Sequence, residues 1–322
     1  MGSELSWSGK IVMVTGAAGL VGTALVTMLK EHGARVVAIV RDIDKANRRL
    51  PEGVEIVAGD VTAPIAYAGK IDYVVHAASP TSSRMFAERP VEVIDAVVCG
   101  AKNVLDFAVG KQVKGIVLLS TMEVYGLTDS DNVAEDGYAA LDTMSPRSCY
   151  PEAKRLAECM FASYAKEYGI RAMVARLTQT FGYGVSKEDN RVFAQFARAI
   201  REGRDIVLKS EGITARCYCS LGDAVSAIAA ILARGEAGIA YNVANPDTFC
   251  TIREMAEMVA SEFSGGRSEV VVEASDVERN GYLPPFRMRL NVDRLRSLGW
   301  KPRFGLKEMF RQVIESLGQD NE

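Results

Sequence analysis

The sequence predicts an α/β protein in which a doubly wound parallel sheet is joined to a smaller C-terminal α/β lobe. A β-branched apolar run at residues 11–14 breaks into a glycine-rich turn, and a helical pattern follows it. Strand and helix patterns then alternate to about residue 175, and the alternation loosens beyond Phe181. Strands that alternate with helices form βαβ units, whose parallel sheet is covered on both faces.

The first strand leads into Gly16, Gly19 and Gly22, and apolar residues recur at helical spacing from Leu20 to Lys30. In such a unit the glycines allow a sharp turn, a close approach to a diphosphate, and tight packing of helix on strand. The helix N-terminus offers N–H groups and a positive dipole end to the anion. Glycines at strand ends also form plain turns, but the position after an N-terminal strand favours a Rossmann-like dinucleotide site.

The remaining elements are predicted from the period of their apolar residues. Strands are expected at 35–40, 54–57, 71–76, 115–119 and 171–175, with helices at 91–109 and 149–168. Pro151 falls in the first turn of the latter helix, where proline is tolerated. Beyond Phe181, helices are expected at 192–202, 223–233, 252–263 and 306–317, extended segments at 205–208, 214–220, 240–243 and 270–273, and loops at 264–267 and 280–286.

These patterns divide the chain into two parts. Residues 1–183 form a dinucleotide-binding domain, to which residues 223–245 return, and residues 184–322 form a substrate-binding lobe. We expect this lobe to lie over the carboxyl ends of the strands, where open α/β sheets bind their ligands.

Composition excludes several classes of function. The 322 residues carry a formal net charge of −3, which argues against a nucleic-acid partner bound through bulk positive charge. The six cysteines form no Cys-x-x-Cys pair and there are two histidines, so we expect reduced thiols and no metal site. The start has no signal-peptide pattern, and no apolar run approaches the about 20 residues that span a bilayer. A soluble, cytoplasmic protein with no membrane partner is expected.

Tyr150 and Lys154 are four residues apart, on one face of the helix predicted at 149–168. A tyrosine with a pKa of about 10 is a poor base at neutral pH. A nearby cation lowers that pKa, and the pair can then take a proton from a hydroxyl as hydride leaves its carbon. The spacing alone is also typical of a surface tyrosine and lysine on a solvated helix.

The segment Ser120-Thr121-Met122-Glu123-Val124-Tyr125-Gly126 follows the strand predicted at 115–119. Catalytic groups gather at strand ends in such sheets. A hydroxyl there can hydrogen-bond the oxygen being oxidised, and Glu123 can act as a second acid or base. A capped loop with a solvent-facing carboxylate is the alternative.

Taken in order, these motifs resemble the extended short-chain dehydrogenase/reductase superfamily, in its nucleotide-sugar epimerase, dehydratase and decarboxylase branch. The motifs are Thr-Gly-x-x-Gly-x-x-Gly, Gly-Asp-Val, His-Ala-Ala-Ser, Ser-Thr-Met-Glu-Val-Tyr-Gly and Tyr-x-x-x-Lys, and the resemblance covers about residues 10–310. It implies an NAD(P)-dependent enzyme that oxidises a nucleotide sugar at C4. A dinucleotide-binding regulator on the same fold is the rival of another class, and the joint presence of Tyr150, Lys154 and Thr121 argues against it.

The resemblance also implies roles for single residues. The cofactor-binding set holds the diphosphate, the adenine and the nicotinamide-side ribose in turn: Gly16, Gly19, Leu20, Val21 and Gly22; Asp60 and Val61; Ala77, Ala78 and Ser79. Tyr150 is the catalytic base and acid, Lys154 binds the nicotinamide ribose, and Thr121 polarises the substrate hydroxyl.

On the substrate side, Arg216 lies in a segment that looks like the family's Thr-Arg-Asp-Phe stretch, whose arginine binds the diphosphate of the sugar nucleotide. The planar fork of arginine suits phosphate oxygens, although a surface charge on a strand is the plain alternative. Arg287 or Arg289 is a second phosphate ligand, and the sequence does not choose between them. Gln179 stands where the family has an asparagine.

Departures from the family pattern bear on the reaction. Met122 replaces the aspartate that dehydratases of this branch carry, which disfavours loss of water. Thr121, Glu123 and the run at residues 146–155 look most like glucuronate decarboxylases, yet Gln179 and Val97 replace two usual asparagines, while Asn103 is retained. We rank a C4-epimerase with a transient 4-keto intermediate first, a decarboxylase second and a 4,6-dehydratase third.

The cofactor and the assembly are also predicted. At the end of the second strand an acidic residue favours NAD and an arginine favours NADP; the chain offers both, as Arg41 and Asp42. NAD is expected, and NADP stays open. The resemblance implies a homodimer in which helices 91–109 and 149–168 pair across a two-fold axis as a four-helix bundle.

Overall fold

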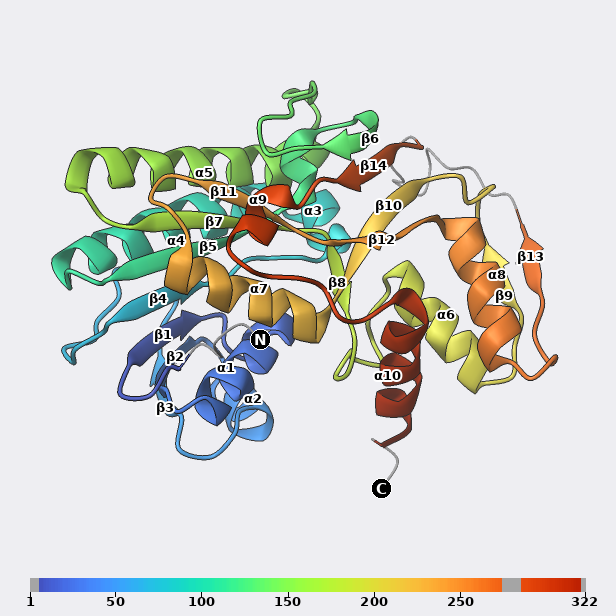
Figure 1. Cartoon of the computed structure of the whole chain (residues 1–322), viewed down its shortest axis with the longest axis horizontal. Coiled ribbons are helices and arrows are strands. Elements are labelled where there is room, and N and C mark those ends of the chain that lie inside the picture. The colour runs from blue at the N-terminus through green and yellow to red at the C-terminus, as the bar shows by residue number, and fades with distance from the viewer. Residues whose placement is uncertain (1–5, 274–284, 320–322) are drawn as a thin grey trace.

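The computed structural model describes residues 6–273 and 285–319. Within them the larger sheet has seven strands in the order β11-β7-β5-β4-β1-β2-β3, and every neighbouring pair is parallel. Its strands are β1 (Ile11–Thr15), β2 (Arg35–Val40), β3 (Glu55–Ala58), β4 (Tyr73–His76), β5 (Gly115–Thr121), β7 (Ala172–Leu177) and β11 (Ala240–Val243). The predicted doubly wound parallel sheet is confirmed (Figure 1).

Both faces of this sheet are buried under helices (Figure 1). The helices are α1 (Leu20–Glu31) and α7 (Leu221–Arg234) on one face, and α4 (Pro90–Gly110) and α5 (Cys149–Tyr168) on the other. Val12 and Val14 of β1 belong to the first core, and Met13 between them belongs to the second. Because side chains alternate along a strand and neither face meets water, the strand is apolar at every position from Ile11 to Val14.

A smaller lobe adjoins the carboxyl ends of several strands. One sheet has the order β12-β10-β14-β6 with β8 paired to β10, and a two-stranded sheet joins β13 to β9. The strands are β6 (Asp129–Val133), β8 (Gln179–Phe181), β9 (Ile206–Leu208), β10 (Ala215–Ser220), β12 (Asn245–Thr251), β13 (Val270–Val272) and β14 (Arg287–Leu290). The helices α6 (Val192–Arg201), α8 (Ile252–Phe263) and α10 (Leu306–Gln319) surround a third core, which contains the stacked rings of Phe181 and Phe193.

The long elements have the predicted bounds or differ by one or two residues at an end, and most of the short elements were missed. The missed elements are α2 (Ile43–Arg49), α3 (Ser83–Glu88), η1 (Met122–Tyr125), η2 (Pro146–Ser148), α9 (Asp293–Ser297), β6, β8, β12 and β14. Of the loop predicted at 280–286, residues 280–284 lie outside the described residues, and the other two have no regular structure.

Chain segments cross between the two parts. β11, from the segment expected to return, pairs with β7 in the large sheet, whereas β6 and β8, from the first 183 residues, pair in the smaller one. The division at residue 183 stays a prediction. Among the described residues, no helix has the length and apolar character needed to cross a bilayer.

Candidate active site

The turn between β1 and α1 is packed too tightly for side chains. Gly16 has a φ of 67°, and a Cβ on it would lie 2.6 Å from the backbone nitrogen of Ala78. A Cβ on Gly22 would lie 2.2 Å from the carbonyl oxygen of Gly16. Gly19 begins α1 without a side-chain cap, and the first turn carries no acidic residue. The turn therefore brings bare backbone and a free helix N-terminus to one place, which fits a dinucleotide diphosphate.

Leu20 and Val21 form the first turn of α1 and are half-buried. The segment after β4 lies against this glycine turn. Ala77 N donates to Thr15 O at 3.2 Å, and Ala78 N donates to Thr15 Oγ1 at 3.3 Å.

His76 Nδ1 lies 2.8 Å from the hydroxyl of Thr15, which fastens the end of β4 to the end of β1. Burial, followed by the charge of Lys154, lowers the pKa of His76 to about 3, so its imidazole is neutral. Ser79 donates its hydroxyl to Pro80 O at 3.2 Å.

The predicted adenine side lies at the ends of β2 and β3. The carboxylate of Asp60 accepts from Thr62 N and Thr62 Oγ1, both at 2.9 Å, and its pKa is lowered, first by the backbone bond. Arg41 lies 3.8 Å from Asp60. Asp42 caps α2 by accepting from Lys45 N at 2.8 Å. Val61 is buried, and its carbonyl accepts from Asn103 Nδ2 at 2.9 Å.

The predicted catalytic residues meet at the end of β5. Thr121 is the last residue of β5, and its Oγ1 accepts from Glu123 N at 3.2 Å. Tyr150 lies in the first turn of α5, and the side chain of Thr121 is near enough to lower its pKa. One turn further along α5, Lys154 donates from Nζ to the carbonyl of Leu119 at 2.8 Å. Tyr150 is 7% exposed and Lys154 2%, so neither is the solvated surface residue that the spacing alone allows.

Lys154 was expected to lower the pKa of Tyr150. Its Nζ lies 5.9 Å from the centre of the Tyr150 ring, and the expectation stays a prediction. The pKa of Tyr150 is raised, first by burial and then by the negative charge of Glu123. The groups that oppose this rise are Thr121, through its hydrogen bond, and Arg147, through its charge. The Nζ of Lys154 points to a backbone carbonyl, and burial lowers its own pKa to about 8.

Two residues beside Tyr150 were not singled out as site residues from the sequence. Phe86 of α3 stacks on its ring, with centroids 4.5 Å apart and an angle of 13° between the planes. Arg147 of η2 donates to Glu123 Oε2 at 3.0 Å. Arg147 stands in the run that resembles decarboxylases and could have been found there, whereas no pattern marks Phe86.

Polar atoms without partners gather on two paired strands of the smaller lobe. Gln179 Oε1, Arg216 Nε and Tyr218 Oη are buried and have no hydrogen-bond partner in the described residues. Gln179 of β8 is the register partner of Tyr218 of β10, and Arg216 lies two residues before Tyr218. Buried polar groups are normally satisfied. These three atoms therefore favour a polar ligand at Gln179 and Arg216, and Tyr218 is a residue that the sequence did not indicate.

Arg287 and Arg289 lie on β14, next to β10, and alternate with buried residues, so both point to one face. Arg287 is paired with Asp131 at 3.1 Å. Both guanidinium groups lie over Phe249, at 5.2 and 5.9 Å from the ring centre. Arg216 pairs in register with Met288 rather than with either arginine, so it points to the other face. The structure brings the three arginines to adjacent strands.

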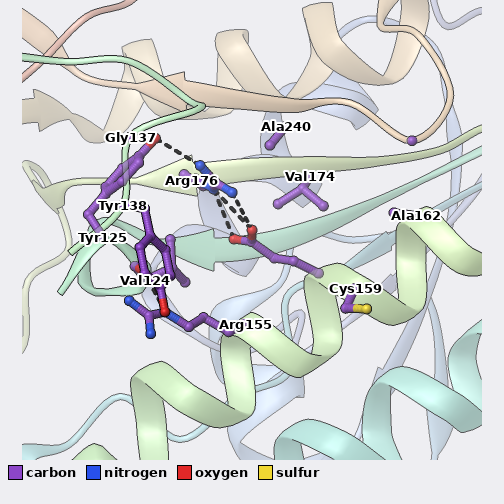
Figure 2. A pocket seen from close by; sticks show the side chains of 12 residues that line it. Val124, Tyr125, Gly137, Tyr138, Arg155, Cys159, Ala162, Val174, Arg176 and Ala240 are labelled. Carbon is purple, nitrogen blue, oxygen red and sulfur yellow. Dashed lines mark hydrogen bonds and ion pairs between the residues drawn. The ribbon is translucent and has the colours of Figure 1, made fainter. Parts of the chain in front are cut away.

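A cavity of about 380 Å³ lies elsewhere, between α5, β7 and the chain near β11 (Figure 2). Neither Tyr150 nor the glycine turn lines it. Arg176 projects into it and pairs with Glu158 at 2.7 Å, and it also donates to the hydroxyl of Tyr125 at 3.0 Å (Figure 2). Although burial opposes it, the pKa of Arg176 is raised by Glu158. Ser120 donates to the same carboxylate, so this network ties the end of β5 to α5.

A parallel sheet with a glycine cradle after β1, and with a threonine, tyrosine and lysine together at the end of β5, defines a class of protein. It is that of dinucleotide-dependent enzymes that move a hydride and a proton from one hydroxyl-bearing carbon. All six cysteines are free, and no group of three or more His, Cys, Asp and Glu side chains in the described part of the chain is arranged to hold a metal ion.

The chain belongs to the NAD dependent epimerase/dehydratase family, whose model matches residues 12–244. UDP-glucuronic acid decarboxylase 1 of Danio rerio is 29% identical over 97% of this chain and 74% of its own length. A solved UDP-galactose 4-epimerase is 26% identical with a TM-score of 0.77, over 97% of this chain and 100% of its own. MoeE5, solved with UDP-glucuronic acid and NAD, is 23% identical with a TM-score of 0.79, over the same shares of the two chains.

These findings confirm the resemblance drawn from the motifs. The chain is an NAD-dependent enzyme of the nucleotide-sugar-modifying epimerase/dehydratase family. Several further curated UDP-glucuronic acid decarboxylases from Arabidopsis thaliana lie at similar identity. The comparisons thus favour the reaction that was ranked second from the sequence.

Proposed function

We propose that this protein decarboxylates a nucleotide-linked glucuronic acid, with UDP-glucuronic acid as the first substrate to test. The observation that supports this best is the Glu123–Arg147 ion pair beside Tyr150, within the segments that resemble glucuronate decarboxylases. The curated relatives point the same way, since UDP-glucuronic acid decarboxylases match almost the whole chain.

NAD fits the glycine cradle and supplies a hydride acceptor that later returns the hydride. We propose that the cradle of Gly16, Gly19 and Gly22 holds its diphosphate, that Asp60 and Val61 meet the adenine, and that Ala77, Ala78 and Ser79 line the ribose next to the nicotinamide. Lys154 would hold that ribose. NAD is proposed over NADP because Asp60, with a lowered pKa, stands 3.8 Å from Arg41 and competes with a 2′-phosphate for its charge.

Tyr150 is proposed to accept the proton of the sugar 4-hydroxyl as the carbon loses its hydride. The hydroxyl of Thr121, which is near enough to the phenol to lower its pKa, is proposed to donate to the oxygen that becomes the ketone. Burial of Tyr150 keeps water from competing for that proton. The resulting ketone is β to the C6 carboxylate, so the bond between C5 and C6 can break with its electron pair delocalised onto the C4 oxygen.

The product of that cleavage is carbon dioxide and an enolate, which takes one proton at C5. The reaction therefore consumes one proton overall. Glu123 is proposed to pass this proton to the sugar, because it is partly exposed, at 32% of its side chain, and stands beside the phenol. Tyr150 then returns its own proton to the 4-oxygen as the hydride returns to C4.

Arg216 is proposed to bind the diphosphate of the sugar nucleotide, with Gln179 beside it. The support is their unpartnered buried polar atoms. The prediction of Arg287 or Arg289 as a second phosphate ligand is not carried further, because Arg287 is already paired with Asp131 and both arginines point to the face of the sheet opposite Arg216.

The test is a product analysis. We expect the purified protein, incubated with NAD and UDP-glucuronic acid, to give a nucleotide sugar that has lost carbon dioxide, and expect Tyr150→Phe to give none. UDP-glucose, UDP-galactose and UDP-N-acetylglucosamine are run in parallel. If the product has the same mass as the substrate for every nucleotide-linked glucuronic acid that is tested, the proposal is contradicted.

Epimerisation at C4 is the second candidate, because a UDP-galactose 4-epimerase is 26% identical over nearly all of this chain. It needs the same oxidation and only a rotation of the ketone before hydride returns. Conversion of UDP-galactose to UDP-glucose without loss of mass would favour it over decarboxylation. Met122 at the position of the dehydratase aspartate keeps loss of water third.

A homodimer through α4 and α5 is proposed as the working assembly. Large apolar side chains stand exposed on these two helices, namely Val91, Ile94, Leu156 and Tyr168, at 67%, 42%, 48% and 53%. We expect a dimeric mass by sedimentation at micromolar concentration, and a monomeric mass for Ile94→Glu with Leu156→Glu. A cytoplasmic location and a substrate-binding role for the lobe at residues 184–322 belong to the same proposal.

A further inference from the structure

Arg147 makes two contacts close to Tyr150. It lies in η2, directly before α5, three residues ahead of the tyrosine. Its Nη2 donates to Glu123 Oε2 at 3.0 Å, and its Cζ lies 5.0 Å from the centre of the Phe86 ring. The Arg147 and Glu123 side chains are 26% and 32% exposed, so this pair is less screened than one on the open surface.

Phe86 links Arg147 to the phenol, because it contacts both the Arg147 guanidinium group and the Tyr150 ring. Its ring, 2% exposed, stacks almost parallel on Tyr150. Phe86 is fixed further by Cys149, whose Sγ donates to the Phe86 carbonyl at 3.7 Å. One face of the Tyr150 ring is therefore covered by an aromatic ring that itself lies under a guanidinium group.

Three side chains from three elements act on the Tyr150 hydroxyl, Lys154 lies 5.9 Å from the centre of its ring, and Lys154 in turn acts on His76. Glu123 comes from η1, Thr121 from the end of β5 and Arg147 from η2. Lys154 lies one turn along α5, with its ammonium donated to a carbonyl, and His76 on β4 is neutral. Within this set Glu123 makes the phenolate less favourable and Arg147 makes it more favourable.

We propose that Arg147 is a positioning residue for the oxidation step: it holds Phe86 against the ring of Tyr150 and neutralises Glu123, so that the phenol is oriented and can ionise next to a carboxylate. This inference rests on the proposed function, in which Tyr150 exchanges a proton with the substrate. It adds Arg147 as a second cation near the phenol, besides Lys154, whose Nζ lies 5.9 Å from the centre of the Tyr150 ring.

The geometry makes the two contacts separable by substitution. Arg147→Met removes the charge and the ion pair. Arg147→Lys keeps a charge near Glu123 but loses the planar group that lies over Phe86. Glu123→Gln removes the carboxylate that Arg147 neutralises. Arg84→Met is the matched control, because Arg84 lies on α3 with Phe86 and its ion pair is with Glu88 on the exposed side of that helix.

The first experiment needs no substrate. The NAD-bound enzyme is labelled with ¹³C at the tyrosine ζ carbon, Tyr150→Phe identifies the resonance, and its titration is followed toward alkaline pH. We expect Glu123→Gln to lower the pKa of Tyr150 and Arg147→Met to raise it. We expect the double variant to return toward the parent, and Arg84→Met to change nothing. At a fixed pH below the pKa, raising or lowering that pKa by one changes the phenolate fraction about tenfold.

The second experiment is a single-turnover measurement of nicotinamide reduction against pH. Arg147→Met should move the alkaline rise of the rate to higher pH, and adding Glu123→Gln should reverse that movement. Arg147→Lys should keep the parent profile but react more slowly at every pH, because the stack on Phe86 is loosened. A purely structural role for Arg147 would lower the rate without moving the profile.

The outcomes separate this inference from the proposed function. If no nucleotide sugar reduces the nicotinamide, the proposed function fails, yet the NMR titration still reports on Arg147. If Arg147→Met titrates like Arg84→Met, or if Glu123→Gln does not cancel its effect, the inference is overturned. Should Arg147→Met fail to fold, Glu123→Gln alone decides, since an unchanged pKa of Tyr150 would show that the pair does not act on it.

Discussion

Replacing Lys154 with methionine should remove activity and change how stability depends on pH. The ammonium of Lys154 is 2% exposed, and burial lowers its pKa from 10.5 to about 8, although Glu158 opposes the change. In the unfolded chain the same amine keeps its ordinary pKa. Between about pH 8 and 10.5 the unfolded state therefore binds a proton that the folded state has lost, so the stability of the parent rises with pH across this window.

The size of the effect follows from the two pKa values. Lowering the pKa from 10.5 to about 8, at about 1.4 kcal/mol for each pH unit, corresponds to about 3 kcal/mol. Below pH 8 both states are protonated, and the full burial cost lowers the stability of the parent. Methionine of similar length removes that cost but leaves the carbonyl of Leu119 without its donor, which costs about 1–3 kcal/mol. At about pH 7 the variant should therefore be as stable as the parent or up to about 2 kcal/mol more stable.

The assay is urea unfolding of both proteins, followed by circular dichroism at several pH values from about 7 to 10. The difference in unfolding free energy should move in favour of the parent by about 2–3 kcal/mol across this range. Other titrating groups are the same in both proteins and cancel, and the pKa values of His76 and Tyr150 lie outside the window. A difference that stays flat with pH would refute a buried, charged Lys154. Activity of the variant should fall on the order of 10²–10⁴-fold.

Three further predictions follow from the described contacts. Tyr150→Phe should abolish nicotinamide reduction with the fold intact, and Thr121→Val should slow it on the order of 10²-fold, both measured by stopped-flow absorbance. Gly22→Ala should weaken NAD binding at least about tenfold by calorimetry and lower the free energy of unfolding by about 2 kcal/mol or more, because its Cβ meets a backbone oxygen at 2.2 Å. Gly110→Ala is the control: its Cβ has nothing within 4 Å, so the variant should be as stable as the parent or up to about 1 kcal/mol more stable. Arg176→Met should lower the free energy of urea unfolding by about 3–5 kcal/mol, because it leaves Glu158 without its ion-pair partner. The double variant Arg176→Met with Glu158→Met should recover most of that stability. Equal losses in the single and the double variant would contradict this prediction.

The larger sheet could be predicted because its signals are local. β2 and β11 have the predicted bounds, since β2 is an apolar run after Arg35, β11 has three apolar residues around Asn242, and both faces of the sheet are covered. The helix α5 has its predicted bounds because it begins after a proline-containing turn and ends at Gly169 in the left-handed conformation.

The smaller lobe could not be predicted in the same way because its strands depend on partners far along the chain. β14 has four residues, two of them exposed arginines, and it becomes a strand because it pairs with β10 and with β6, which comes from the first half of the chain. β6 has the sequence Asp-Ser-Asp-Asn-Val, which no strand propensity favours, and the same distant pairing fixes it. Arg287 and Arg289 were named as alternatives, but their shared strand and the pairing of one with Asp131 are properties of the fold.

At the candidate site the residue types could be read from the sequence, and the fold decided their electrostatics. Tyr150 and Lys154 were expected to act on each other because four residues on a helix bring side chains together. In the structure the Lys154 ammonium lies 5.9 Å from the centre of the Tyr150 ring and donates to the carbonyl of Leu119 at the end of β5. Glu123 and Arg147, from two short turns, add further charges near the phenol. Helix geometry can place two groups side by side, but burial and the direction of each donor determine which of them shares a proton.

This arrangement bears on the choice between decarboxylation and epimerisation. An epimerase returns every proton it takes, so a phenol and a hydroxyl are sufficient, and a carboxylate near the phenol only makes ionisation harder. A decarboxylase must in addition deliver a proton to C5, which needs a second group that is both near the sugar and in contact with solvent. Glu123 fits that requirement, because its side chain is partly exposed and lies near the phenol, and its pairing with Arg147 opposes its effect on Tyr150. If Glu123→Gln released carbon dioxide as fast as the parent but accumulated no product protonated at C5, the carboxylate would act at C5. If the variant instead epimerised the sugar faster than the parent, the carboxylate would have no role in the reaction, and the ranking of the two reactions would reverse.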